Sequence, residues 1–119
     1  MIWIKSASLL MFIAVALGAF GAHALKAHLS DYSLDVYKTA VLYHFIHALA
    51  IFAVAWISAY TNDPKAHYAG LCFLAGIVLF SGSLYLLSVT GLKWLGAITP
   101  LGGIYFLAGW FILLLTRAN

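Results

Sequence analysis

Charge and sulfur are scarce in this 119-residue sequence. It has three aspartates, no glutamate, six lysines and arginines together, and one cysteine, Cys72. A single cysteine excludes a disulfide within the chain. The basic residues are spread singly and form no patch, so nucleic-acid binding is not expected despite a net charge of +3. Charged residues make up only 8 % of the chain, whereas 66 % of it is hydrophobic.

Nearly all the hydrophobic residues fall in four long runs. A helix needs about 20 apolar residues to cross about 30 Å of hydrocarbon, and each run is long enough. The aspartates lie between the runs, because a charge at the centre of a span costs roughly 2.5–3.5 kcal/mol. The short connections favour antiparallel neighbours. The sequence therefore predicts an all-α membrane protein, a single domain over residues 1–119 with four transmembrane helices in an up-down-up-down bundle. The predicted spans are residues 3–25, 38–60, 67–89 and 94–116.

Three of these spans have an end that the sequence leaves open. In the first run, the apolar stretch Leu9–Leu17 is followed by Ala22-His23-Ala24, which fits a signal-peptide cleavage site, although the whole run is long enough to span. Polar residues at 30–35 offer N-cap oxygens, so the second helix is expected to begin outside the bilayer. Pro100 either starts the fourth helix late or kinks a longer helix.

Small residues predict where the helices pack. Ala14, Gly18 and Ala22 recur every four residues, and Gly102 and Gly109 lie seven apart on one helix face. Helices in lipid associate by close packing, which small residues permit. The pattern does not distinguish a neighbouring helix of the same chain from a second copy, so it leaves a homo-oligomer open. The glycines predicted to serve helix packing are Gly18, Gly21, Gly82, Gly102, Gly103 and Gly109.

Polar side chains within the spans gather in one leaflet, towards the first and third connections. His44 and His47 share a face of the second span, about 9 and 13 Å past Lys38 at ~1.5 Å per residue. Ionisable groups in a span usually face the bundle interior or a water-filled cavity. The predicted polar cluster consists of His23, Tyr43, His44, His47, Ser81, Ser83, Tyr85 and Thr99.

Three functions fit such a cluster. It could fix helix packing in a structural or accessory protein that acts through membrane lipid or an unidentified membrane protein partner. It could belong to a small transporter or channel subunit whose cavity is gated by protonation of His47. It could bind metal or haem through His23, His44 and His47, but no cysteine, methionine or carboxylate lies at matching depth, so no metal or cofactor is predicted. Because no nucleophile–base–acid set is present, an enzyme is not expected.

Four motifs follow one another along the chain: LGAFGAHAL at 17–25, Thr39-Ala40 with Tyr43 and His47, LFSGSLY at 79–85, and Thr99-Pro100-x-Gly102-Gly103 with Gly109-Trp110. In these the sequence resembles domain-of-unknown-function family 423, small bacterial inner-membrane proteins with eukaryotic relatives called transmembrane protein 256. The resemblance implies four helices in the cytoplasmic membrane and no established activity.

The resemblance also bears on the site and on orientation. The family favours glutamine where this chain has His44. The resemblance therefore implies that His23, Tyr43 and His47 are the better candidates for functional residues. Three cations fall at each end of the predicted bundle, so charge alone does not orient it. Four spans place both termini on the same side. The basic C-terminal tail of family members implies that this side is the cytoplasm, and here Arg117 alone supports it.

Overall fold

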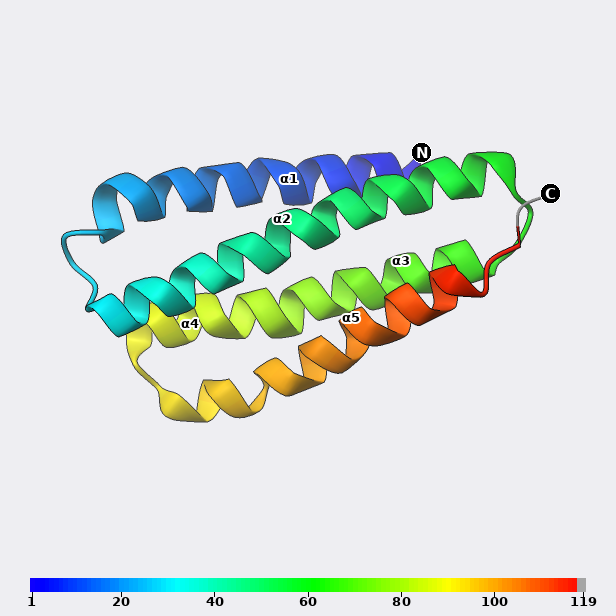
Figure 1. Ribbon diagram of the computed structural model, residues 1–119. Coiled ribbons are helices and arrows are strands. Elements are labelled where there is room, and N and C mark those ends of the chain that lie inside the picture. Colours follow the sequence, from blue (N-terminus) through cyan, green and yellow to red (C-terminus); the bar gives the residue numbers. More distant parts are fainter. Residues whose placement is uncertain (118–119) are drawn as a thin grey trace.

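The chain folds almost entirely into helix in the computed structural model, which describes residues 1–117 (Figure 1). The elements in order are α1 (Ile2–Phe20), η1 (Gly21–Leu25), α2 (Asp31–Tyr60), α3 (Lys65–Gly76), η2 (Ile77–Ser81), α4 (Gly82–Thr90), η3 (Lys93–Ala97) and α5 (Thr99–Leu114). The elements η1 and η2 are single π-helical turns that continue their neighbouring helices, and η3 is a 3-10 turn.

Within the described residues, four continuous helical segments are long and apolar enough to cross a membrane. They are Ile2–Leu25, Asp31–Tyr60, Lys65–Thr90 and Lys93–Leu114. The predicted class, an all-α membrane protein with four spans, is confirmed. The second segment begins seven residues before the predicted boundary, because the Ser30 side chain caps it by accepting a hydrogen bond from the Ser33 N–H at 3.1 Å. Pro100 lies in the first turn of α5, which starts late after η3.

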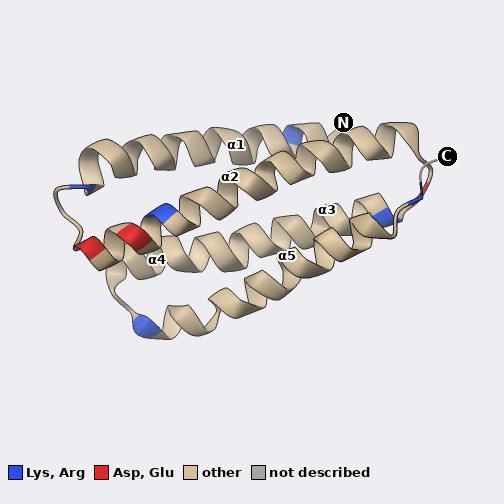
Figure 2. Ribbon diagram, in the orientation of Figure 1, with Lys and Arg blue, Asp and Glu red and all other residues tan. Residues whose placement is uncertain are grey.

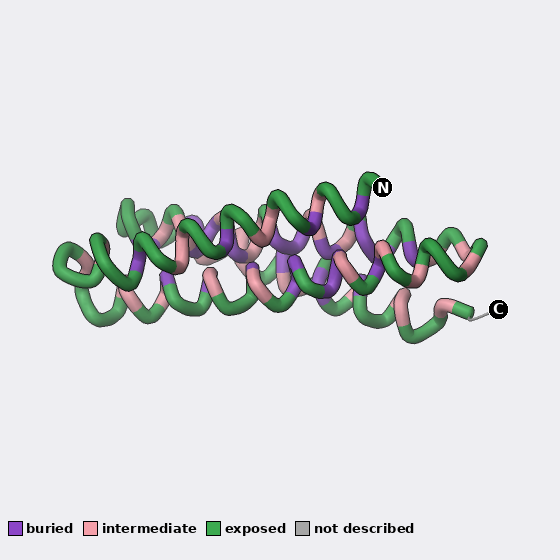
Figure 3. Tube along the Cα trace, turned by 90° about the horizontal axis from the view of Figure 1, so that it is seen from above, coloured by how far each residue is buried: buried purple, intermediate pink, exposed green. Residues whose placement is uncertain are grey.

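The four segments form a flattened arrangement of 50 × 26 × 17 Å. In Figure 1 the chain reverses direction at each of three connections, and α1 and α5 run along opposite edges. These outer helices are the least enclosed: 11 % and 17 % of the residues in their apolar stretches are buried, against 39 % and 44 % in the two inner segments. Figure 3 shows the buried positions along the middle of the molecule. Much apolar surface therefore remains for lipid.

The apolar core draws on all four segments. Its buried residues are Trp3, Ala7, Ala50, Ile51, Val54, Ala69, Phe73, Ile77 and Phe106. Phe73 of α3 is fully enclosed. Aromatic rings here lie directly over glycines: Trp3 covers Gly70 and Phe73 covers Gly109, and a Cβ at either glycine would come within 3 Å of the ring. The helices therefore pack closely, as expected in lipid, where an aromatic ring of one helix lies against a glycine of another.

The small-residue stripes predicted from the sequence are used within the chain. Ala14 is fully buried, and a Cβ at Gly18 would lie 3.3 Å from Val41 of α2. A Cβ at Gly21 would overlap the Tyr37 ring. The face of α1 that carries this stripe therefore packs on α2.

The remaining glycines divide into two kinds. A Cβ at Gly102 of α5 would overlap the backbone of Phe80 in η2, and one at Gly76 would overlap the Phe106 ring. At Gly82 and Gly103 the nearest atom would lie 3.9 Å away, which is ordinary contact, so the close approach predicted there is not found. Gly70 and Gly76, which were not among the predicted positions, do allow a close approach, because an aromatic ring lies against each of them.

Charged residues lie towards the two ends of the helices (Figure 2). At one end the Asp63 carboxylate accepts hydrogen bonds from the backbone N–H groups of Lys65 and Arg117, both at 3.0 Å, and its Oδ2 lies 3.5 Å from Lys65 Nζ. The Trp3 ring meets the His67 ring edge-on at 5.3 Å. The start of α1, the connection between α2 and α3, and the end of α5 therefore lie together (Figure 1).

Removing the Asp63 carboxylate should loosen the end of α5. The pKa of this carboxyl lies below its usual 3.8, mainly because it accepts a hydrogen bond from the Arg117 N–H, and secondly because it accepts one from the Lys65 N–H. Such a group stabilises the fold above pH 3.8, and the contribution is lost as the pH falls through the lowered pKa. We expect Asp63→Ala to speed hydrogen exchange at the Arg117 amide at neutral pH. The difference in exchange rate between Asp63→Ala and the wild type should become smaller at a pH low enough to protonate the wild-type carboxyl.

The matched control is Asp35→Ala, which removes an exposed aspartate near the start of α2, at the opposite end of that helix from Asp63. It should leave exchange at Arg117 unchanged at every pH. Equal exchange in wild type and Asp63→Ala at neutral pH would show that this carboxylate does not hold the end of α5.

Candidate functional site

Three polar aromatic side chains connect α1, α2 and α4 near the first connection. The Tyr85 hydroxyl lies 2.9 Å from His44 Nδ1. The Tyr37 and Tyr85 rings meet edge-to-face at 5.3 Å, and the Tyr37 hydroxyl donates to the Leu17 carbonyl of α1. Tyr37 and His44 are both only 3 % exposed. The group therefore ties three helical segments together within the span.

The second nitrogen of His44 has no such partner. Nε2 is buried without a hydrogen bond in the structure, although the backbone of Leu10 in α1 lies close to the imidazole. A buried polar atom left unpaired costs about 1–3 kcal/mol. Where Tyr85 donates to Nδ1, Nε2 carries the ring proton and is an unused donor. His44 is thus the one imidazole of α2 with hydrogen-bonding capacity to spare.

His47 lies one turn further along α2, in an aromatic seam. Its ring stacks on Phe106 with 3.5 Å between centroids and 8° between planes. Trp110 Nε1–H donates to His47 Nε2 at 3.1 Å, and His47 Nδ1 lies 2.8 Å from the Tyr43 carbonyl. An indole nitrogen can only donate, so Nε2 must accept and Nδ1 must carry the proton. A neutral imidazole therefore satisfies both bonds, in a single tautomer.

Hydroxyl groups at η2 and α4 make further bonds between helices. Ser81 Oγ, which is fully buried, donates to the Ala40 carbonyl of α2 at 2.8 Å. Ser83 Oγ donates to the Phe80 carbonyl at 2.9 Å and lies 2.7 Å from Thr99 Oγ1. Since Ser83 has one hydroxyl proton, Thr99 is the donor in that pair. These bonds join η2 to α2 and α4 to α5.

The structure thus brings part of the predicted cluster together, as separate contacts. His44 meets Tyr85, Ser83 meets Thr99, and Ser81 meets the backbone of α2. Each contact joins two helical segments. The geometry is that of several polar links within a packed interior, and not of one shared pocket.

The other predicted residues lie outside these contacts. His23 is exposed on η1. The Tyr43 ring packs on Phe80 at 4.5 Å and remains partly exposed. His47 is buried among aromatic rings, with Trp110 as its side-chain partner.

Two bonded side chains, Tyr37 and Trp110, were not in the predicted cluster. Tyr37 lies seven residues before His44 and so on the same face of α2, a spacing that could have included it. Trp110 is 63 residues from His47, and no local pattern connects them. The sequence indicated only that a buried His47 needs a hydrogen-bond partner for each ring nitrogen, and not that Trp110 is one of them.

Metal binding finds little support in this geometry. Within residues 1–117 no group of three or more histidine, cysteine, aspartate or glutamate side chains is placed to hold a metal ion. His47 uses both nitrogens in the bonds described above, and His23 lies on the exposed side of η1. The three histidines weighed as ligands are therefore not assembled as a site.

Comparison with known proteins gives a consistent family. Residues 17–103 match a family described as protein of unknown function (DUF423). The chain is 47 % identical over 108 residues to UPF0382 membrane protein YwdK of Bacillus subtilis (strain 168), covering 90 % of this chain and 88 % of the relative. It is 45 % identical over 103 residues to UPF0382 membrane protein SAB0533 of Staphylococcus aureus (strain bovine RF122 / ET3-1), covering 87 % and 84 %. No solved structure matches.

The matched residues, 17–103, include both partners of the Tyr37–Leu17, His44–Tyr85, Ser81–Ala40 and Ser83–Thr99 contacts, whereas Trp110, the partner of His47, follows the matched part. The resemblance seen in the sequence motifs is confirmed by this match and by relatives that align over nearly their whole length. The chain belongs to the DUF423 family of membrane proteins.

Proposed function

We propose that this chain is a structural or accessory protein of the bacterial cytoplasmic membrane, with both termini in the cytoplasm and no catalytic activity of its own. The observation that carries the proposal is the use of the intramembrane polar groups. His47, Ser81 and the Ser83–Thr99 pair all bond to a neighbouring helical segment. Groups committed in this way hold the fold together and are not free to bind a substrate.

The geometry of these hydrogen bonds, more than their strength, supports the same role. Hydrogen bonds between membrane helices average about 0.6 kcal/mol each, so a few of them add little to stability. Their geometry is specific, however, because each requires one rotation and one height of the two helices. They serve a protein that must present a defined outer surface to its surroundings.

That outer surface is apolar and large on the two edge helices. Phe12 of α1 and Leu107, Phe111 and Leu114 of α5 are all well exposed. Ala14, Gly102 and Gly109 are buried against neighbouring helices of the same chain, so association with another protein or a second copy would use these large side chains. Membrane lipid or a membrane protein partner is the corresponding ligand.

A small transporter or channel subunit is the second candidate, and one observation favours it. His44 Nε2 is a buried polar atom without a hydrogen-bond partner. A gate at His47 is less well supported, because both of its ring nitrogens already have partners. A metal or haem protein has still less support, since no group of three donor side chains assembles within residues 1–117.

Proton flux separates the two leading candidates. Purified protein is reconstituted into vesicles that contain a pH-sensitive dye, and a pH gradient is imposed. We expect the gradient to decay no faster than in protein-free vesicles, because the polar groups bond to helices and form no continuous path. The same rate is expected for His44→Gln.

A faster decay that His44→Gln abolishes would contradict the accessory role and favour the transporter. His28→Gln is the control variant, because it removes an exposed histidine of the first connection by the same substitution. A flux that both variants keep would point to a pathway that does not involve His44, and would also contradict the proposal.

A further inference from the structure

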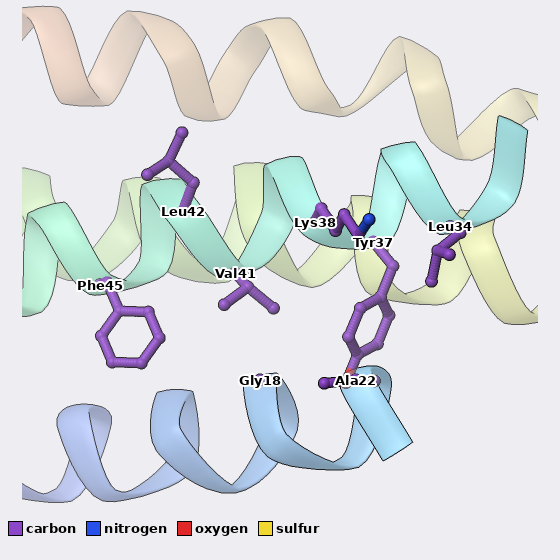
Figure 4. A pocket seen from close by; sticks show the side chains of 9 residues that line it. Gly18, Ala22, Leu34, Tyr37, Lys38, Val41, Leu42 and Phe45 are labelled. Atoms are coloured by element: carbon purple, nitrogen blue, oxygen red, sulfur yellow. The ribbon is translucent and has the colours of Figure 1, made fainter. Parts of the chain in front are cut away.

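An open apolar groove runs between the end of α1 and the first half of α2 (Figure 4). It encloses about 260 Å³. Figure 4 shows Tyr37, Val41 and Phe45 directed from α2 towards α1, where Gly18 and Ala22 leave space. The lining residues are Gly18, Gly21, Ala22, Leu34, Tyr37, Lys38, Val41, Leu42 and Phe45. Lys38 is the one charged member of this lining.

The shape of the groove is fixed by a polar link. The Tyr37 hydroxyl donates to the Leu17 carbonyl of α1, and the Tyr37 ring lies against Gly21, where a Cβ would overlap it. This contact braces α1 against α2 beside the groove. The groove is therefore a built feature of the fold, and both of its walls are tied together.

The part of the groove below Lys38 lies within one leaflet of a bilayer. The 30 residues of α2 span about 45 Å at ~1.5 Å each, against about 30 Å of hydrocarbon. Lys38 lies seven residues after Asp31, or about 10 Å from the start of α2, which places it near the boundary between headgroups and hydrocarbon. From Lys38 to Phe45 the lining extends about 10 Å into the hydrocarbon, which is within the thickness of one leaflet.

The charge at the rim is free to bind an anion. Lys38 is exposed, and the ion pair found within residues 1–117 is Lys65 with Asp63, at the other end of the molecule. Asp35 lies one turn before Lys38 on α2, and Lys26 follows η1 in the connection that leads into α2. Lysine binds phosphate as a point charge, and cationic side chains at this depth attract anionic headgroups.

We propose that this groove is a binding site for one anionic phospholipid. An acyl chain lies along the apolar wall from Val41 to Phe45, and the phosphate lies at the Lys38 ammonium. This inference goes beyond the proposed function, because the groove could hold a lipid in an accessory protein or in a transporter.

The test uses phosphatidylglycerol with a photoreactive acyl chain, present as a trace component of phosphatidylcholine vesicles that contain the full chain. After illumination, the labelled positions are mapped by peptide mass spectrometry. We expect labelling to concentrate on the groove lining, at Val41, Leu42 and Phe45. Even labelling over the exposed face of α5, as strong at Leu107 and Leu114 as in the groove, would overturn the proposal.

Two variants separate the charge from the cavity, each with a matched control. Lys38→Gln should reduce groove labelling about fivefold, the factor expected for one lysine near an anionic headgroup, and Lys93→Gln should not. Ala22→Leu fills the groove and should also reduce labelling, whereas Ala24→Leu, at an exposed position of η1 outside the lining, should leave it unchanged.

Circular dichroism establishes that each variant keeps the helical content of the wild type. The mapping on wild-type protein is decisive even where a variant does not fold. Labelling of Lys38→Gln at the wild-type level would show that the rim charge selects no lipid, and would overturn the proposal of an anionic ligand. A photoreactive phosphatidylcholine that labels the groove as strongly as phosphatidylglycerol would overturn it as well.

Discussion

Gly102→Ala should strongly destabilise the protein. A Cβ at this position of α5 would lie 2.6 and 2.7 Å from Phe80 Cβ and Cα, and closer still to its backbone nitrogen. Backbone atoms of η2 cannot rotate away as the end of a flexible side chain can, so α5 or η2 must shift. Overpacking costs typically about 1–3 kcal/mol and occasionally more, and we expect the upper part of that range. The free energy of unfolding is measured by titration with SDS in mixed micelles, followed by circular dichroism.

The adjacent glycine provides the control. Gly103→Ala adds the same methyl group to the same helix, but the nearest atom, Phe80 Cδ2, would lie 3.9 Å away. Both substitutions gain similarly in helix propensity, by up to about 1 kcal/mol, so the difference between them isolates the contact with Phe80. Gly103→Ala should unfold at the wild-type SDS fraction or above it. Equal loss of stability in the two variants would contradict the close packing of α5 on η2.

Phe73→Ala is the second substitution with a large expected effect. The Phe73 ring is fully buried, lies against Gly109 and is 4.8 Å from the Trp110 ring between centroids. Its removal leaves a cavity in the middle of the core, and changes of this kind cost about 3–5 kcal/mol. The same SDS titration should show the loss, together with a change in tryptophan fluorescence as Trp110 loses its neighbour.

Phe111→Ala is the matched control for this change, because Phe111 of α5 is 61 % exposed. Lipid or detergent chains can occupy the space that the missing ring leaves, so the cost should stay within about 0.5 kcal/mol, as for surface substitutions in general. A loss in Phe111→Ala as large as that in Phe73→Ala would mean that the core does not lie where the structure places it.

The spans could be predicted from the sequence because the thickness of the bilayer dictates them. Each run must hold about 20 apolar residues, and the charged residues lie at or near the ends of the runs. The faces of the helices could not be predicted in the same way. Phe73 and Phe111 both lie in continuous apolar runs, since lipid is as apolar as the protein core, and so no pattern marks which of them is buried. Gly102 and Gly103 are indistinguishable for the same reason.

The depths of the polar side chains along their helices could be predicted from the sequence. Their partners depend on how the helices cross, which depth does not determine. Ser81 bonds to a carbonyl 41 residues away, and Trp110 reaches His47 across 63 residues. The π-helical turns η1 and η2 were also beyond prediction. Each rotates the residues that follow it relative to an α-helix, and so changes which side chains face a neighbour.

The order in which the helices contact one another has a consequence for biogenesis. The second segment packs on the first, α3 and α4 pack on the second, and α5 packs on α3. Each span that leaves the ribosome therefore finds its partner already inserted, and the protein can assemble by lateral addition in the order of synthesis. A nascent chain arrested after Tyr60 already contains both sides of the Tyr37–Leu17 bond, so its first hairpin can close before the remaining half of the protein is translated.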